Sequence, residues 1–265
     1  MTMREASGEL LLRRQDGAVL TLCLNRPQAG NSLSRPMIEA LQRALDTAGE
    51  DEGVNVVVIE AAGEKVFCAG HDLKEFLDNN SPKFSKTIAS ECSRMMQTIV
   101  ALPKPVIAKV AGVATAAGCQ LVAACDLAVA ADTSRFATPG VNIGLWCSTP
   151  MVALSRAIAP KHTMQMLLTG RMIDAETALR FGLVNETVPR DRLDARTREL
   201  AQEIASKSQY TVALGKAAFY RQLGLDLASA YDYASEVVVR NMMAEDAAEG
   251  ISAFVQRRQP VWKNR

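Results

Sequence analysis

Two glycine-containing turns carry the residue types from which a catalytic site could be built. FCAGHDLKE spans residues 67–75, and AGVATAAGCQ spans residues 111–120. We expect a helix to begin at each turn, where the first backbone N–H groups have no partner inside the helix. These donors and the helix dipole favour negative charge, so two such turns facing each other could hold an oxyanion between two peptide N–H groups. The same small residues would also let a helix pack tightly on a sheet, and this purely structural alternative stays open.

Motifs of the common nucleotide-binding and hydrolase classes are absent from the sequence. It contains no Gly-x-Gly-x-x-Gly, no phosphate-binding loop, no Gly-x-Ser-x-Gly and no His-Glu-x-x-His. Six cysteines form no Cys-x-x-Cys pair, and there are only two histidines. We therefore expect reduced, buried thiols and no metal site.

Strand patterns alternate with helix patterns over the first part of the chain, which predicts an α/β body with parallel strand pairing. We expect strands at 18–24, 55–60, 65–68, 105–110 and 126–130, and helical segments at 34–49, 72–78, 84–102 and 116–124. From residue 151 onward the pattern is mostly helical, with one short strand at 183–188. We divide the chain into a core, residues 1–190, and a C-terminal helical subdomain, residues 191–265.

Composition and charge indicate a globular protein without a polyanionic partner. The 265 residues are 48% hydrophobic and 22% charged, and the formal net charge is +1. Such a charge sets up no overall field that would recruit nucleic acid or an anionic membrane surface. Charged residues interrupt the first 17 residues, so we predict no signal peptide there. Prolines and glycines interrupt the longest charge-free segment, residues 136–155, so we predict no membrane helix. We expect a cytoplasmic protein.

The two turns, in this order, resemble those of the crotonase superfamily, the enoyl-CoA hydratase/isomerase family. FCAGHDLKE is similar to the family's Phe-x-Ala-Gly-x-Asp-Leu/Ile-Lys-Glu segment, and GVATAAGCQLVAACDLAVA to its oxyanion helix and following strand. FATPGVNIGL and TGRMIDAETALRFGLVNETV are similar to later family segments, so the resemblance runs from about residue 18 to residue 261. FxxGHDLKE, ATAAGCQLVAxCD and FATPGVNxGLxCSTP together are most similar to one branch of the family. The resemblance implies a crotonase-like spiral of ββα units with a C-terminal helical trimerisation subdomain.

The resemblance also implies a site and a substrate class. The oxyanion donors would be the backbone N–H groups of His71 and Ala117, which would bind the carbonyl oxygen of an acyl-CoA thioester. Coenzyme A would be part of the substrate, and no cofactor would be bound covalently. The protein would be a homotrimer or a dimer of trimers. Positions matching the coenzyme A contacts of the family are Arg26 to Ala29, Ala69, Asp72, Leu73 and Lys74, together with Phe254 and Arg257 from the C-terminal helix, often of a neighbouring subunit.

The sequence departs from the family where hydratases carry two catalytic glutamates. The matching positions hold Gln120 and Gly140. Neither residue can transfer a proton near neutral pH, and the loss of each glutamate should lower the hydration rate by a factor of ~10² to 10⁴. No Asp or Glu occurs in residues 92–125 or 133–173, and Asp126 is expected to be a structural hydrogen-bonding residue.

Three functions remain open. Hydration of 2-enoyl-CoA thioesters in fatty-acid metabolism, a lyase activity, is the nominal one; decarboxylation of a malonyl-type CoA thioester needs no base; a degenerate hydratase would only bind acyl-CoA. The His71 ring could titrate near neutral pH or only pack against its neighbours. Cys147 is expected to be a buried thiol, and the remaining candidate side chains nearby are Asn142, Trp146 and Ser148.

Overall fold

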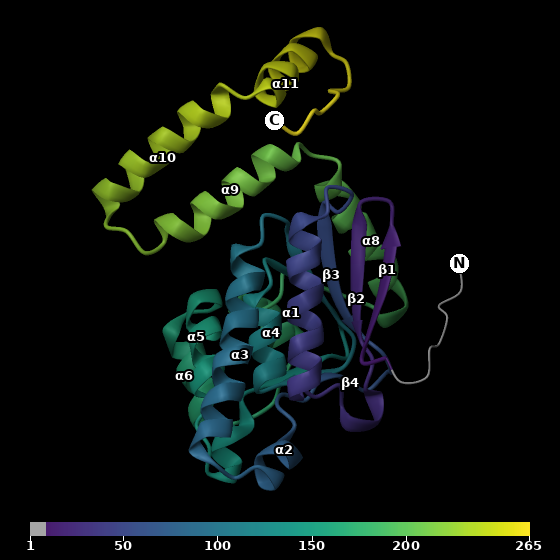
Figure 1. Ribbon diagram of the computed structural model, residues 1–265, viewed down its shortest axis with the longest axis vertical. Helices are drawn as coiled ribbons and strands as arrows, with labels where there is room; N and C mark the ends of the chain where they lie inside the picture. Colours follow the sequence, from purple (N-terminus) through teal and green to yellow (C-terminus); the bar gives the residue numbers. More distant parts are fainter. Residues whose placement is uncertain (1–8) are drawn as a thin grey trace.

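Two β-sheets form the body of the protein in a computed structural model that describes residues 9–265, and helices cover them (Figure 1). The N-terminal segment predicted to hold no signal peptide lies partly in residues 1–8, outside the described residues. No helix of the described chain is both long enough and apolar enough to cross a membrane.

Ten strands are present in residues 9–265. They are β1 (Leu11–Asp16), β2 (Val19–Leu24), β3 (Val56–Ala61), β4 (Val66–Cys68), β5 (Val106–Val110), β6 (Val113–Thr115), β7 (Leu127–Ala131), β8 (Arg135–Ala137), β9 (Ile173–Asp174) and β10 (Glu186–Val188).

In the described part of the chain, eleven α-helices and three short 3₁₀ helices connect the strands or follow them. The α-helices are α1 (Arg35–Glu50), α2 (Leu73–Asp78), α3 (Pro82–Ala101), α4 (Ala117–Ala124), α5 (Ser148–Ala157), α6 (Pro160–Thr169), α7 (Ala175–Phe181), α8 (Leu193–Ala205), α9 (Gln209–Gln222), α10 (Leu227–Met242) and α11 (Glu245–Gln256). The 3₁₀ helices are η1 (Pro27–Ala29), η2 (Pro139–Ile143) and η3 (Arg190–Arg192).

From β3 to β8, successive strands alternate between the two sheets. The larger sheet has the order β1-β2-β3-β5-β7-β10, and all its pairs are parallel except β1 with β2. The smaller sheet has the order β4-β6-β8-β9, in which only β8 with β9 is antiparallel. The pairs β3/β4, β5/β6 and β7/β8 thus each give one strand to each sheet, which winds the chain into a spiral. The predicted α/β body with parallel pairing is confirmed.

The larger sheet is buried on both faces, as parallel sheets usually are. In β3, Val57 and Ile59 belong to the main core, which also contains apolar residues of α1, α3 and α4. Val56 and Val58 face the other way and pack in a second cluster with Leu193 and other residues of α8. The alternation of the strand therefore places one helical layer on each side.

The sequence prediction missed four strands: β1, β6, β8 and β9. β6 and β8 have three residues each and β9 has two. Segments this short show no alternation of their own, because pairing with neighbouring strands defines them. The other predicted strands and helices form close to their expected bounds, although the strand expected at 183–188 is shorter in the structure (β10).

The C-terminal helices differ in how they relate to the sheets. α8 packs on the larger sheet through Leu193 and Ala201. α9 is joined to the segment before β7 by hydrogen bonds of Lys216 and Tyr220, whereas α10 and α11 lie farther from the sheets (Figure 1). The proposed boundary after residue 190 stays a prediction, and α8 lies on its C-terminal side while contacting the core. Apolar side chains exposed on α10 and α11 include Tyr231, Val238, Val239, Met242, Phe254 and Val255.

Candidate functional site

The first glycine turn lies directly against the second. Gly70 has φ +99°, a conformation that favours glycine, and a Cβ built on it would lie 3.2 Å from the backbone N of Ala117. The hydroxyl of Thr115 donates to the carbonyl oxygen of Ala69 over 3.0 Å, and β4 pairs with β6 just before these turns. The structure therefore brings the residue before His71 into contact with the start of α4.

The second turn is held in an unusual backbone conformation at the start of α4. Ala116 has φ 50° and ψ −119°, which is strained for a residue with a Cβ. Its N–H donates to the carbonyl oxygen of Ala137 over 3.0 Å, which ties α4 to the end of β8. A Cβ at Gly118 would lie 2.1 Å from the carbonyl oxygen of Cys68, so only glycine lets α4 approach β4 this closely. In residues 9–265, neither the N–H of His71 nor that of Ala117 donates a hydrogen bond.

The His71 ring lies in a partly buried position beside Phe76. The two rings meet edge to face with centroids 5.9 Å apart. Burial lowers the pKa of His71, and a hydrogen bond to the backbone of Leu33 opposes this only in part. The ring is therefore neutral at pH 7, and its Nδ1 atom is buried without a partner among the described residues.

The two positions predicted to match the family's catalytic glutamates are both buried. Gln120 is 3% exposed and lies one helical turn beyond Ala116. Gly140 lies in η2, and a Cβ there would lie 2.6 Å from the carbonyl oxygen of Leu145 and 3.0 Å from Sγ of Cys147. The loop from 140 to 147 therefore closes over the glycine and leaves no room for a longer side chain.

The other nearby candidate side chains show no sign of activation. Cys147 is buried, and burial raises the pKa of its thiol more than a backbone hydrogen bond from Gly140 lowers it. The expectation of a buried thiol is confirmed, and the other five cysteines are also buried and unpaired. Trp146 is 43% exposed, so it is not a core residue. The hydroxyl of Ser148 donates to the carbonyl oxygen of Trp146, and Asn142 packs against Gly170.

Asp126 has a structural role, as expected. One carboxylate oxygen accepts hydrogen bonds from the backbone N of Val106 at 2.7 Å and from Nζ of Lys216 at 2.6 Å. The other accepts from the hydroxyl of Tyr220 at 2.9 Å. Asp126 therefore joins α9 to the sheet through structural hydrogen bonds.

Part of the predicted coenzyme A surface is assembled within one chain. Asn31 accepts a hydrogen bond from the N of Arg26 and donates to the carbonyl oxygens of Ala62 and Val66, which places the segment after β2 beside β4. Arg26 forms an ion pair with Asp72 at 2.7 Å. These two predicted positions thus lie together, and the guanidinium group of Arg26 already has a carboxylate partner.

The remaining predicted contacts are exposed around this pair or distant from it. Ala29 lies at the end of η1, and Ala69, Leu73 and Lys74 are exposed at the other turn. Phe254 is 85% exposed, and Arg257 follows α11. Figure 1 shows α11 and α2 at opposite ends of the molecule. One chain therefore does not bring Phe254 and Arg257 to the predicted site.

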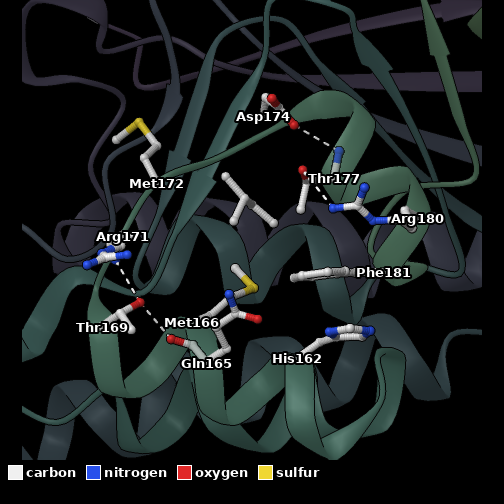
Figure 2. A pocket seen from close by; sticks show the side chains of 11 residues that line it. His162, Gln165, Met166, Thr169, Arg171, Met172, Asp174, Thr177, Arg180 and Phe181 are labelled. Atoms are coloured by element: carbon white, nitrogen blue, oxygen red, sulfur yellow. Dashed lines mark hydrogen bonds between the residues drawn. The ribbon is translucent and has the colours of Figure 1, made fainter.

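A separate hollow of about 500 Å³ opens between α6, β9 and α7 (Figure 2). The His162 and Phe181 rings stack beside it with centroids 3.7 Å apart. The carboxylate of Asp174 accepts from the N of Thr177 at 2.9 Å. None of the residues predicted from the sequence lines this hollow.

Thr138, which was not predicted as a site residue, lies between Ala137 and the Pro139-Gly140 pair. The side chain is fully buried, and its hydroxyl has no hydrogen-bond partner in the described chain. A threonine inside the otherwise apolar FATPGV segment was the available signal.

Comparisons with known proteins agree with this architecture. The family model described as enoyl-CoA hydratase/isomerase matches residues 14–265. The crystal structure of an enoyl-CoA hydratase from Mycobacterium smegmatis superposes with a TM-score of 0.93 at 49% identity, over 96% of this chain and 99% of that one. The chain therefore belongs to the enoyl-CoA hydratase/isomerase family of the crotonase superfamily, whose members act on acyl-CoA thioesters, and the predicted crotonase-like fold is confirmed.

The branch indicated by the sequence motifs is that of enoyl-CoA hydratase domain-containing protein 3, and it is confirmed. The mitochondrial protein of that name from Mus musculus is 46% identical over 260 residues, which cover 98% of this chain and 86% of the mouse protein. Carnitinyl-CoA dehydratase from Escherichia coli (strain SMS-3-5 / SECEC) is 33% identical over 262 residues, covering 97% and 99% of the two chains.

Proposed function

We propose that this protein binds an acyl-CoA thioester with the carbonyl oxygen between the backbone N–H groups of His71 and Ala117. Both groups have no acceptor in residues 9–265, and the turns that carry them are in contact. Two donors aimed at one oxygen stabilise the negative charge that develops when the α-carbon becomes an enolate. The strained conformation of Ala116 supports this proposal, because backbone strain concentrates at functional sites.

The site favours enolate chemistry that needs no carboxylate acid or base. Hydration of 2-enoyl-CoA, the nominal activity, would have to proceed with Gln120 and without a side chain at residue 140. The observation that carries the proposal is at Gly140, where an added Cβ would lie 2.6 Å from the carbonyl oxygen of Leu145, so the loop leaves no space for a side chain. Water held by Gln120 would at most support slow hydration, since an amide cannot accept its proton.

Decarboxylation of a malonyl-type thioester is the second candidate. The bond between the α-carbon and the carboxylate breaks, carbon dioxide leaves, and the electron pair enters the enolate, which later takes a proton from water. The neutral surroundings favour it: Gln120 and Gly140 replace two carboxylates that would repel the carboxylate of the substrate. Binding of acyl-CoA without turnover is the third candidate.

Direct assays separate these candidates. We expect the rate of crotonyl-CoA hydration to be at least 10²-fold lower than in family members that carry both glutamates, because one general acid or base usually contributes a factor of about this size. Release of carbon dioxide from malonyl-type thioesters would identify a decarboxylase, and binding without turnover a binder. Hydration within tenfold of those members would contradict the acid–base argument. Ala117→Pro removes one proposed donor, so retention of any observed turnover by a folded variant would refute the oxyanion assignment.

We also propose that the protein is a homotrimer or a dimer of trimers, in which Phe254 and Arg257 of one copy complete the coenzyme A surface of another. The apolar side chains exposed on α10 and α11 support this, because exposed apolar patches commonly mark interfaces. Light scattering after gel filtration measures the number of copies in the assembly.

We also propose a cytoplasmic location for this protein, and a fluorescent fusion tests it. The name of the mouse relative gives a mitochondrial location instead.

A further inference from the structure

The last nine residues, 257–265, form a tail that runs back from α11 toward the start of α9 (Figure 1). Chain ends are usually poorly ordered unless specific contacts hold them. Two residues of the tail, Arg257 and Asn264, have positive φ values of 55° and 60°, a conformation that is uncommon outside glycine and marks a turn. The tail therefore follows a defined path, and its contacts show where it is held.

Asp246 on α11 holds the tail from one side. Its carboxylate accepts hydrogen bonds from the backbone N of Lys263 at 2.7 Å and from the backbone N of Asn264 at 3.0 Å. The backbone N of Asp246 in turn donates to the carbonyl oxygen of Arg265 over 3.2 Å. Asp246 is 2% exposed, and burial of a carboxylate is costly unless hydrogen bonds replace its hydration. The burial of Asp246 and the path of the tail therefore depend on each other.

On its other side, the tail contacts the junction between α8 and α9. Oδ1 of Asn264 accepts from the backbone N of Gln209, the first residue of α9, at 2.9 Å. The indole N–H of Trp262 donates to the carbonyl oxygen of Ser206, the residue after α8, over 2.8 Å. A Cβ added to Gly250 of α11 would lie 3.2 Å from the Trp262 ring, so this ring also packs on α11. The tail therefore joins α11 to the α8–α9 junction.

These polar contacts matter because the C-terminal helices bury few residues. Within residues 9–265, no residue of α9 or α10 is buried, and α11 buries only Asp246 and Ala253. Apolar burial inside one chain therefore contributes little to the position of α11. The hydrogen bonds of the tail determine it instead.

We propose that the tail is a clamp on α11 and that Asp246 is a positioning residue, which holds Phe254 and Arg257 in place to contact the coenzyme A part of a substrate. Phe254 lies about two helical turns after Asp246 on α11, and Arg257 begins the tail. This inference rests on the proposed function, in which Phe254 and Arg257 of one copy complete the coenzyme A surface of another. Asp246 acts only through these residues, because its own carboxylate is buried and already bonded.

Glu245 provides a matched control, because it is the neighbouring carboxylate on α11 but an exposed one. Its side chain is 50% exposed and pairs with Nζ of Lys263 at 3.1 Å and with Nε of Arg265 at 3.0 Å. Exposed ion pairs of this kind contribute little to stability. We therefore expect Glu245→Ala to resemble the wild type in every measurement, whereas Asp246→Ala removes the acceptor of two backbone N–H groups.

Hydrogen exchange followed by mass spectrometry tests the clamp in the full-length protein. We expect Asp246→Ala to accelerate exchange at least tenfold in peptides that cover residues 206–212 and 257–265, while exchange in β3 and β5 stays unchanged. Asn264→Gly is a milder second variant, because glycine keeps the positive φ and only the acceptor for Gln209 is lost. It should accelerate exchange at residues 206–212.

Calorimetric titration with butyryl-CoA tests the link between the clamp and binding. We expect Phe254→Ala and Asp246→Ala each to raise the Kd at least fivefold, and Glu245→Ala to leave it within twofold of the wild type. If Asp246 acts through Phe254, the double variant should bind no more weakly than Asp246→Ala alone, since the effects of coupled residues are not additive. Two independent roles would multiply the losses.

Several results would overturn the inference. Unchanged exchange at residues 206–212 in both Asp246→Ala and Asn264→Gly shows that the tail does not hold α11. Faster exchange throughout β3 and β5 of Asp246→Ala, or loss of the assembly in light scattering, shows that Asp246 has a general structural role. Faster exchange at 206–212 with unchanged affinity, or multiplied losses in the double variant, removes the positioning role and leaves the oxyanion proposal intact.

The failure of the proposed function has a different signature. If the wild type does not bind butyryl-CoA, the proposed acyl-CoA site fails and the positioning role of Asp246 fails with it. The exchange measurements then still decide whether the tail holds α11, because they need no ligand.

Discussion

Gly140→Ala tests whether the loop after β8 has closed around the position of a missing acid. The added Cβ would lie 2.6 Å from the carbonyl oxygen of Leu145 and 3.0 Å from Sγ of Cys147. The loop cannot yield easily at this point, because the N–H of Leu145 also donates to the carbonyl oxygen of Gly140 over 2.9 Å. The methyl group and the backbone carbonyl oxygen therefore compete for the same space.

The expected effect is destabilisation of about 1–3 kcal/mol, the usual range for overpacking a buried site. In a chain of this size, each kcal/mol lowers the melting temperature by about 2–4 °C. Gly215→Ala is the matched control, because nothing lies within 4 Å of its added Cβ and the residue is inside α9. Helix propensity alone should stabilise that variant by up to ~1 kcal/mol.

We predict that a glutamate can be introduced at position 120 with a gain in activity, but not at position 140. Gln120→Glu changes one atom type at constant shape and should raise crotonyl-CoA hydration by ~10² or more, the contribution of one general acid or base. Adding Gly140→Glu should lower stability further without another such gain. We would measure initial hydration rates and melting curves of both variants.

Two results would refute the reasoning. A melting temperature of Gly140→Ala equal to that of the wild type would show that the loop opens freely. Hydration by the double Gln120→Glu, Gly140→Glu variant at a rate typical of family members would show that only the acids, and not the loop, separate this protein from them.

Three further predictions concern the same region. Gly118→Ala should abolish acyl-CoA binding measured by calorimetry and lower the melting temperature, because its Cβ would lie 2.1 Å from the carbonyl oxygen of Cys68; unchanged binding would contradict the close approach of α4 to β4. The His71 ring should titrate below pH 6.5 in an NMR experiment; since the unfolded chain then binds more protons, the contribution of His71 to stability should decrease as the pH falls below 6.5 through the folded pKa. Burial raises the pKa of Cys68 and Cys119 to about 12, so neither thiol of the folded protein should react with iodoacetamide at pH 8, and rapid labelling by mass spectrometry would contradict their burial.

The sequence predicted the elements whose own residues specify them. The alternation at 18–24, the apolar run at 105–110 and the helical spacing at 84–102 each correspond to an element with one or two buried faces. It also identified the family through the two glycine turns, and predicted that Gln120 and Gly140 stand where hydratases of the family carry catalytic glutamates. These conclusions depend on residue types that lie close together in the chain.

Only the tertiary structure decided features that join distant segments. The short strands β6, β8 and β9 exist because neighbouring strands pair with them. The pairing of Arg26 with Asp72, the closure of the loop over Gly140 and the unsatisfied hydroxyl of Thr138 likewise depend on contacts between residues far apart in sequence. Periodicity reports which face of an element is buried, but a steric clash or a missing hydrogen-bond partner depends on the positions of atoms that a different segment supplies.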